Sequence, residues 1–246
     1  MNNKLICLDS VDSTNTYLKK LAHSGCDEGT VVIADSQTAG RGRMGRAFFS
    51  QSGAGVYLSV LLKPSCTPEE AGSLTPHVAV AVCKAIERVC NVKPDIKWVN
   101  DLLIGGKKIC GVLCESSIGP DGMPDYVVCG VGVNVINRAE DFPDAIKSIA
   151  GSIYTQCGIE VERGTLIAAI VEEIMKMYAL WKKDKKAYLE DYRARCITTG
   201  KYIQIKSTSG IADAYAKEIS DDFGLTVNAA GGTVTLHSGE ISIINE

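Results

Sequence analysis

Short apolar segments recur through the first 135 residues, and their length and spacing constrain the fold more than any other feature of the sequence. They lie at residues 5–9, 30–36, 55–62, 96–98, 109–115 and 126–135. Apolar runs of this length, bounded by glycine and polar residues, predict β-strands. Gly105-Gly106 separates Leu102-Leu103-Ile104 from the strand that follows, which predicts a tight hairpin.

Helical patterns separate several of these segments. The first spans residues 13–22, with Asp12 or Ser13 as its cap. Thr67 and Glu70 form a capping-box signature around Pro68, and Thr75-Pro76 repeats the start signal. Apolar residues then recur at helical spacing: Val78, Val82, Ile86 and Val89. A long helical pattern covers residues 165–195, and its Lys-rich part, 182–186, indicates either a solvated face or a break.

The character of the sequence changes after Gly200. Short alternating runs such as Tyr202-Ile203-Gln204-Ile205 and Thr233-Val234-Thr235-Leu236 are separated by glycines, which predicts a small all-β module. We place the boundary between a domain of residues 1–198 and a module of residues 199–246.

Composition excludes several classes of protein. A formal net charge of −3 over 246 residues is not that of a general polyanion binder, so any basic patch must be local. The 10 cysteines include no Cys-x-x-Cys pair and the 3 histidines are scattered, so no metal-ligand cluster is indicated. The N-terminus lacks a signal-peptide pattern and no apolar run approaches ~18 residues, which predicts a cytoplasmic protein with reduced thiols and no membrane partner.

A glycine- and arginine-rich segment, residues 40–46, concentrates Arg41, Arg43 and Arg46 in this acidic chain. Glycine lets the backbone approach a ligand, and guanidinium groups bind phosphate or carboxylate, so the segment predicts an anion-binding loop. The spacing also fits Gly-x-Gly-x-x-Gly, but the residues that follow do not predict the helix that a dinucleotide fold needs. No Walker-type loop occurs, and an RNA-binding loop would need a wider basic surface. A merely solvated loop also fits the pattern.

Two further polar clusters follow apolar strands. The hairpin should bring Asn100, Asp101 and Lys108 to one end of the sheet, where oxygen ligands suit Mg²⁺ and a lysine suits phosphate. Taken alone, this cluster is explained better by turn chemistry and an edge-strand lysine than by a magnesium or phosphate site. In Gly130-Val131-Gly132-Val133-Asn134, the glycines indicate either close approach of another group or a bulge.

The order of these motifs is more specific than any one of them. Along the chain occur Asp12-Ser13-Thr14-Asn15, Gln37-Thr38-Ala39 with the arginine loop, Lys97-Trp98-Val99-Asn100-Asp101, Lys108-Ile109-Cys110-Gly111 through Glu115, and the segment 130–134. This set closely resembles the biotin–protein ligase family over residues 5–136, and more weakly through Ser238-Gly239-Glu240-Ile241-Ser242. Val99 departs from the family, which commonly has proline there.

The resemblance implies an α/β fold, in which a mixed sheet is flanked by helices as in class II aminoacyl-tRNA synthetases, with a small C-terminal SH3-like barrel. It implies an ATP-dependent ligase, of the biotin–[acetyl-CoA-carboxylase] ligase type, that forms biotinyl-5′-AMP and transfers biotin to a lysine of a biotin carboxyl carrier domain. Because the ligase core begins at residue 5, we expect the enzyme-only form, without the N-terminal DNA-binding domain of some members and without a DNA partner. A homodimer is compatible with the resemblance, which does not fix the oligomeric state.

Rival functions match the sequence less well. A lipoate–protein ligase has a similar fold, but the Arg-Arg-x-x-Gly-Gly-Gly segment of that family is absent from this sequence. A DNA-binding co-repressor would need a recognition helix ahead of the ligase core, and we expect none. A non-catalytic module that only binds biotin would not need the cationic residues.

The resemblance also implies roles for individual residues. The expected catalytic residues are Arg41, Arg43, Lys108 and Asp101. Biotin is expected to contact Ser13, Thr14, Asn15, Gln37, Arg41, Gly42, Arg43, Lys108 and Gly111. ATP is expected to contact Arg41, Arg43, Arg46, Phe48, Trp98, Asn100, Lys108 and Asn134. Mg²⁺ is expected near Asn100, Asp101 and Asn134.

Overall fold

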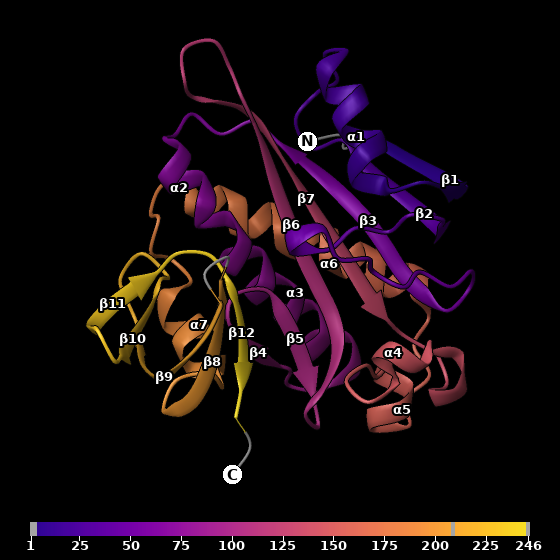
Figure 1. The fold of residues 1–246 in the computed structure, drawn as a ribbon. Helices are drawn as coiled ribbons and strands as arrows, with labels where there is room; N and C mark the ends of the chain where they lie inside the picture. Colours follow the sequence, from indigo (N-terminus) through magenta and orange to yellow (C-terminus); the bar gives the residue numbers. More distant parts are fainter. Residues whose placement is uncertain (1–3, 208–209, 245–246) are drawn as a thin grey trace.

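A seven-stranded mixed sheet forms the larger part of the molecule (Figure 1). The structure, a computed structural model, describes residues 4–207 and 210–244. The strands are β1 (Leu5–Val11), β2 (Val31–Gln37), β3 (Gly55–Leu62), β4 (Asp95–Lys97), β5 (Asp101–Ile104), β6 (Lys107–Ile118) and β7 (Pro124–Asn134), in the spatial order β1-β2-β3-β7-β6-β5-β4. Only β1 and β2 are parallel, and the other neighbours are antiparallel. The predicted α/β fold with a mixed sheet is therefore confirmed.

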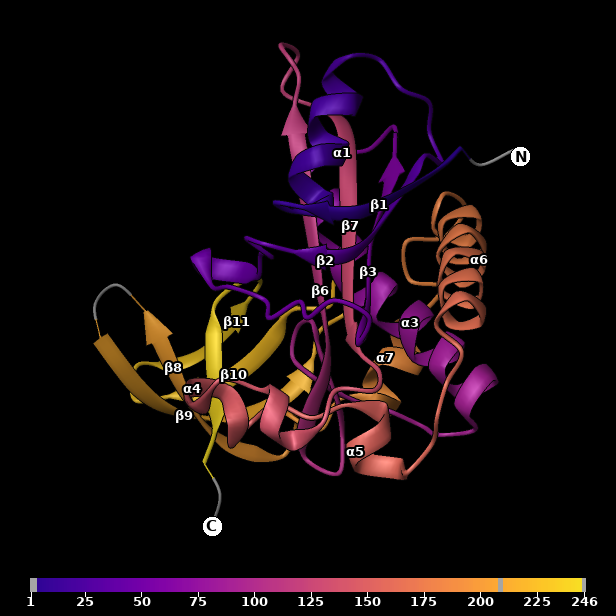
Figure 2. The same cartoon turned by 90° about the vertical axis from the view of Figure 1, so that its right-hand side faces the viewer.

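Helices cover both faces of this sheet, because alternate residues of each strand point to opposite sides (Figure 2). Helix α1 (Thr14–His23) packs on β2, β3 and β7, where Leu18 meets Val32 and Leu61. The other face is covered by α3 (Leu74–Cys90) and α6 (Arg163–Trp181), which contact each other and the sheet. Within the described residues no helix is both long and apolar enough to cross a bilayer.

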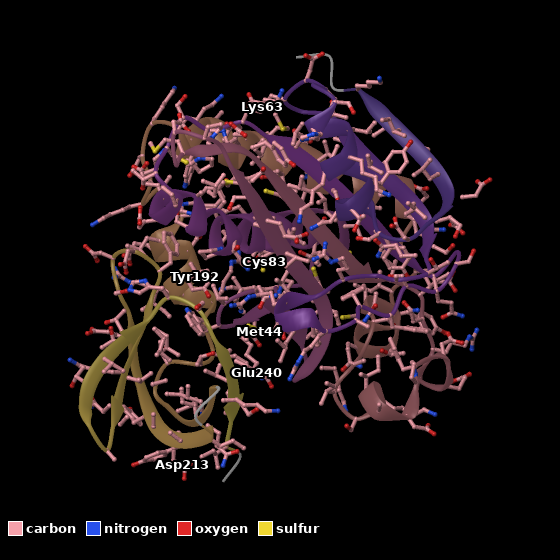
Figure 3. The ribbon with its side chains drawn as sticks, turned by 45° about the horizontal axis from the view of Figure 1, so that its top comes forward. Met44, Lys63, Cys83, Tyr192, Asp213 and Glu240 are labelled. Atoms are coloured by element: carbon pink, nitrogen blue, oxygen red, sulfur yellow. The ribbon has the colours of Figure 1, made fainter. Side chains whose placement is uncertain are left out.

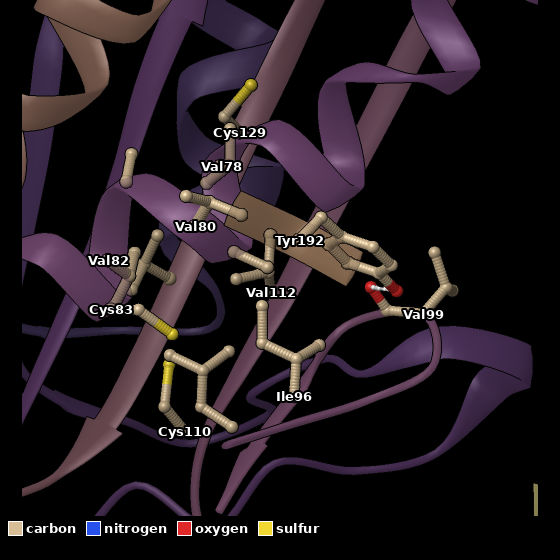
Figure 4. Close-up of a cluster of buried hydrophobic side chains, with 14 of the residues drawn as sticks. Val78, Val80, Val82, Cys83, Ile96, Val99, Cys110, Val112, Cys129 and Tyr192 are labelled. Atoms are coloured by element: carbon tan, nitrogen blue, oxygen red, sulfur yellow. Dashed lines mark hydrogen bonds between the residues drawn. The ribbon is translucent and has the colours of Figure 1, made fainter. Parts of the chain in front are cut away.

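Buried small and branched side chains fill the space between α3 and the sheet (Figure 4). Val78 and Val82 of α3 are fully buried, as are Cys83 and Cys110. Cys110 therefore packs as a small buried hydrophobe, and burial raises the pKa of its thiol. Tyr192 closes the cluster, and its hydroxyl donates to the Val99 carbonyl at 3.1 Å.

Helix boundaries follow the predicted caps in most places. Ser13 caps α1, and Thr67 and Glu70 form a capping box at α2 (Pro68–Gly72). The second helix start predicted at Thr75-Pro76 is confirmed, although α3 begins one residue earlier, at Leu74, directly after the Ser73 that ends α2. A proline in the first turn is tolerated because its missing N–H would have no helical partner there.

The predicted long helix is divided into α6 and α7 (Leu189–Arg195), so the Lys-rich stretch is a break. A segment that the sequence left unassigned contains the 3₁₀ turn η2 (Ala139–Asp141) and the short helices α4 (Asp144–Lys147) and α5 (Ile153–Cys157). It runs beside the start of β6, where the Lys108 N–H donates to the Ile149 carbonyl at 2.8 Å.

The C-terminal module is a second sheet of five antiparallel strands, as the sequence predicted. They are β8 (Lys201–Ser207), β9 (Gly210–Ile219), β10 (Leu225–Ala229), β11 (Gly232–Leu236) and β12 (Glu240–Ile243), in the order β11-β10-β9-β8-β12. Phe223, in the turn between β9 and β10, is buried against the larger domain. Its carbonyl accepts from Trp98 Nε1 at 3.1 Å, and its ring lies 4.5 Å from that of His77.

His77 is buried at the junction between the larger domain and the C-terminal module. It is fully buried between Tyr188 and Phe223, its Nδ1 lies 2.6 Å from the Ser73 carbonyl and its Nε2 has no partner among the described residues. Burial lowers the pKa of His77 to about 4, against 6.5 for a free histidine, so the imidazole is neutral in the folded protein.

We predict that His77→Phe flattens the pH dependence of folding. Between pH 6.5 and 4 the unfolded chain binds a proton at His77 that the folded chain does not, so acidification removes stability, by up to about 3 kcal/mol. Urea unfolding at a series of pH values measures this. The substitution should remove most of that loss, whereas His23→Phe, at an exposed position, should behave as the parent. Identical slopes for parent and His77→Phe would contradict the assignment.

Candidate functional site

A cavity lies where the two sheets meet, and every site residue predicted from the sequence lines it. Its floor is formed by β6 and β7, and its walls by the start of α1, the arginine loop, the turn after β4 and the beginning of β12. The lining residues that had been predicted are Ser13, Thr14, Asn15, Gln37, Arg41, Gly42, Arg43, Arg46, Phe48, Trp98, Asn100, Asp101, Lys108, Gly111 and Asn134.

One end of the cavity is lined by uncharged hydrogen-bonding groups. Gln37 Oε1 accepts from the Thr14 N–H at 2.9 Å, and Gln37 Nε2 donates to Ser50 Oγ at 2.8 Å. Ser59 Oγ lies 2.8 Å from Thr14 Oγ1 and 2.6 Å from Asn15 Oδ1. These contacts fix the side chains before any ligand arrives, as a site for a neutral polar ring requires.

Glycines in the floor make room for side chains from other elements. A Cβ on Gly130 would lie 2.1 Å from Asn15 Oδ1, and one on Gly132 would lie 2.5 Å from Phe48 Cε1. The strand register is regular at both positions, since Gly111 pairs with Gly132 and Leu113 with Gly130. The glycines therefore reflect close approach, and the interpretation of a bulge was wrong.

The arginine loop folds back on itself as a narrow turn. The Phe48 N–H donates to the Gly40 carbonyl at 2.8 Å, and the tip is a 3₁₀ turn, η1 (Arg43–Gly45), in which Met44 has φ of 55°. No α-helix begins inside the motif, which is what a dinucleotide fold would require, so the exclusion of a dinucleotide fold is confirmed.

Glu115 of β6 contacts the start of this loop, at Arg41. Its carboxylate lies 3.1 Å from Arg41 Nη2 and 2.5 Å from Lys19 Nζ, and it accepts from Asn15 Nδ2 at 2.9 Å. Burial opposes ionisation of this carboxyl, but the hydrogen bonds from Lys19 and Asn15 outweigh it and lower the pKa of Glu115. Glu115 therefore joins β6, α1 and the loop through one charged group.

Three further cations of the cavity come from two elements: Arg43 and Arg46 from the arginine loop, and Lys108 from β6. Arg43 reaches inward, and its Nη1 lies 3.3 Å from Asn100 Oδ1; burial lowers the pKa of this guanidinium. Lys108 Nζ lies 2.7 Å from Asp101 Oδ1, as the hairpin predicted. Arg46 forms an ion pair with Glu240 of the C-terminal module.

The predicted magnesium ligands differ in whether their oxygen atoms already have a hydrogen-bond or ion-pair partner. Asn134 Nδ2 donates to the Gly151 carbonyl at 2.9 Å, whereas its buried Oδ1 has no partner among the described residues. The Asn100 oxygen accepts from Arg43, and the Asp101 carboxylate is paired with Lys108. Mg²⁺ in nucleotide sites needs only one or two protein oxygens besides water and phosphate, so this donor set fits the ion.

Several lining residues were missed by the sequence analysis. Phe49, Phe142, Ile146 and Ile149 form an apolar side of the cavity, and the Phe49 and Phe142 rings lie 6.0 Å apart. The segment from 139 to 150 has no recognisable motif, so nothing in the sequence indicated it. Glu240 lies in a segment that resembles the family weakly, and this resemblance is the sequence feature that could have indicated its place in the cavity.

Comparison with known proteins gives a consistent result. Residues 7–134 match the Biotin/lipoate A/B protein ligase family. The chain is 34% identical over 247 residues to the bifunctional ligase/repressor BirA of Bacillus spizizenii, covering 99% of this chain and 75% of that protein. It is 31% identical over 236 residues to the biotin–[acetyl-CoA-carboxylase] ligase of Mycobacterium tuberculosis, covering 93% and 85% respectively.

Among solved structures, the biotin protein ligase from Aquifex aeolicus in complex with biotin and ATP superimposes with a TM-score of 0.83. It has 28% sequence identity to this chain, and the match covers 100% of both chains. The likeness therefore extends through both sheets.

We predict that Glu115→Gln loosens the arginine loop. Loss of the carboxylate charge weakens its contacts to Arg41 and Lys19, so trypsin should cut within residues 40–47 roughly 5-fold faster, equivalent to about 1 kcal/mol of local stability. Limited proteolysis with mass spectrometry measures this. Glu172→Gln, which removes an exposed ion-pairing carboxylate remote from the loop, is the matched control. Equal cleavage rates for both variants would show that Glu115 does not hold the loop.

Proposed function

We propose roles for the site residues from one premise: the chain belongs to the biotin/lipoate A/B protein ligase family. It is an ATP-dependent biotin–protein ligase, which activates biotin as biotinyl-5′-AMP and transfers it to a carrier protein. The observation that carries this conclusion is the cavity itself, where a neutral polar pocket and converging cations meet in a fold that matches a biotin- and ATP-bound ligase over its full length. The protein substrate is a carboxylase, and we propose its biotin carboxyl carrier domain as the acceptor.

In the first half-reaction, two anions must be brought together. A biotin carboxylate oxygen attacks the α-phosphorus of ATP, and pyrophosphate leaves. Preorganised positive charge lowers the barrier to such a step. We assign it to Arg43 and Lys108, which both line the cavity. Arg41, at the start of the loop, contributes guanidinium donors that Glu115 does not use.

Biotin's ureido ring is uncharged, and we assign it to the neutral end of the cavity. Ser13, Thr14, Asn15 and Gln37 line that end, with Gly42 and Gly111 allowing close approach. We propose ATP contacts from Arg46, Phe48, Trp98, Asn100 and Asn134, and we place the adenine in the direction of the apolar side formed by Phe49, Phe142 and Ile146.

Magnesium belongs to the proposal as well. Asn134 Oδ1, with Asn100 and Asp101 nearby in the lining, would hold Mg²⁺, which when bound supplies positive charge to the phosphates of ATP. The ion pair with Asp101 fixes the position of Lys108.

In the second half-reaction, the neutral lysine amine of the carrier attacks the acyl carbon of the mixed anhydride, and AMP leaves. We propose that Asp101 orients this amine or accepts its proton. The arginine loop excludes water while the carrier arrives, because the anhydride hydrolyses readily.

We further propose that the catalytic domain comprises residues 1–198 and the C-terminal module residues 199–246, since α7 ends at Arg195 and β8 begins at Lys201. Cytoplasmic action is proposed because the reaction uses ATP and the described cysteines are free thiols.

ATP–pyrophosphate exchange tests the substrate assignment. We expect label from pyrophosphate to enter ATP only when biotin and Mg²⁺ are both present, because the adenylate must form reversibly. Lipoate supplied at the same concentration should give background exchange. Exchange with lipoate and not with biotin would overturn the assignment.

Arg43→Gly tests the loop. Removing Arg43 abolishes its hydrogen bond to Asn100, which we expect to hold the loop over the adenylate. Activated biotin should then escape and label bystander proteins at least ~5-fold more than the parent does. Blotting for biotin on added serum albumin measures this, with Lys63→Gly, an exposed position in another loop, as the control (Figure 3). Bystander labelling no greater than the parent's would contradict the proposal.

A further inference from the structure

Lys97 differs from the other cations that line the cavity. Arg41, Arg43, Arg46 and Lys108 each contact a carboxylate or an amide oxygen. The Lys97 ammonium, although it also lines the cavity, has no hydrogen bond or ion pair in the described part of the chain. Its side chain is partly buried, so water compensates for only part of this missing contact.

The charges around Lys97 make the isolated ammonium unfavourable without a ligand. The cations whose charges act on it are Lys108 and Arg46, and the carboxylates are Asp101 and Glu240. Those carboxylates are paired with Lys108 and Arg46, respectively. Three cations thus share two anions. Burial, reinforced by Lys108 and Arg46, lowers the pKa of Lys97, whereas Asp101 opposes that shift.

The backbone holds Lys97 at a defined place in the site. Lys97 ends β4 and pairs in register with Asp101 of β5. The next residue, Trp98, is fixed from both sides: its N–H donates to Thr198 Oγ1 at 3.0 Å and its Nε1 donates to the Phe223 carbonyl. Lys97 is therefore held where the charges of both Lys108, at the proposed reaction centre, and Arg46, at the contact with the C-terminal module, act on it.

We propose that Lys97 binds the β- and γ-phosphates of ATP and stabilises the pyrophosphate that leaves. This inference rests on the proposed function and gives a role to a residue that belongs to a sequence motif but had no role assigned from the motif or from the comparisons. As the bond between the biotin carboxylate oxygen and the α-phosphorus forms, the bond from that phosphorus to the bridging oxygen breaks, and the electron pair remains on pyrophosphate. Lys97 stays protonated throughout and offsets this developing charge, so it transfers no proton.

Lys97→Met tests the inference in ATP–pyrophosphate exchange. The substitution keeps a chain of similar length and removes the charge. We expect the KM for pyrophosphate and the KM for ATP each to rise roughly tenfold, while the KM for biotin stays within twofold. Lys97→Arg, which restores the charge, should recover most of the affinity for pyrophosphate. Lys93→Met, an exposed lysine four residues earlier on the same segment, is the matched control.

A second measurement separates this role from a structural one. Purified biotinyl-5′-AMP is supplied with carrier protein, so that no pyrophosphate takes part. Lys97→Met should transfer biotin within twofold of the parent rate. An unchanged KM for pyrophosphate, or an equal loss in exchange and transfer, would overturn the role of Lys97. Absence of biotin-dependent exchange in the parent would instead overturn the proposed function, so the two failures are distinguishable.

Discussion

Mutual repulsion among cationic side chains around one cavity is the constraint on which the arrangement of the site depends. The chain as a whole carries a formal net charge of −3, so this concentration of positive charge is local. The carboxylates that offset it come from different elements: Glu115 from β6, Asp101 from β5 and Glu240 from β12. Each pairing neutralises a cation and also ties two parts of the chain together. Charges needed for catalysis therefore contribute to the shape of the site before substrate binds.

The floor of the cavity shows how a sheet accommodates two kinds of ligand chemistry. Because residues 130 and 132 lack side chains, Asn15 and Phe48 can pack directly on the strand backbone. Asn15 then belongs to the neutral polar network and also donates to Glu115, which binds Arg41. The polar pocket and the cationic loop are thus joined through a shared carboxylate. We expect ordering of one to favour ordering of the other.

Local features of the sequence predicted most of the structure. The strands, the hairpin at Gly105-Gly106 and the caps at Ser13 and Thr67 depend on short-range chemistry, and the structure has all of them. The assembly of predicted residues around one cavity depended on the order of several motifs, which no single motif could indicate. The pairing of Arg46 with Glu240 and the apolar side formed by Phe142 and Ile146 could not be predicted, since they depend on long-range packing of segments without a local signature.

The contacts of the C-terminal module explain why a separate sheet matters to the site. Its β9–β10 turn inserts Phe223 beside His77 and accepts a hydrogen bond from Trp98, while β12 binds Arg46. Trp98 and Arg46 both line the cavity. The module therefore touches the site at two places, one of them buried and one partly exposed. Since the buried contact involves a backbone carbonyl, and the exposed one a charge pair, the first is insensitive to salt and the second is screened by it. The buried contact between Trp98 and Phe223 should therefore persist at high ionic strength, even where the ion pair between Arg46 and Glu240 weakens.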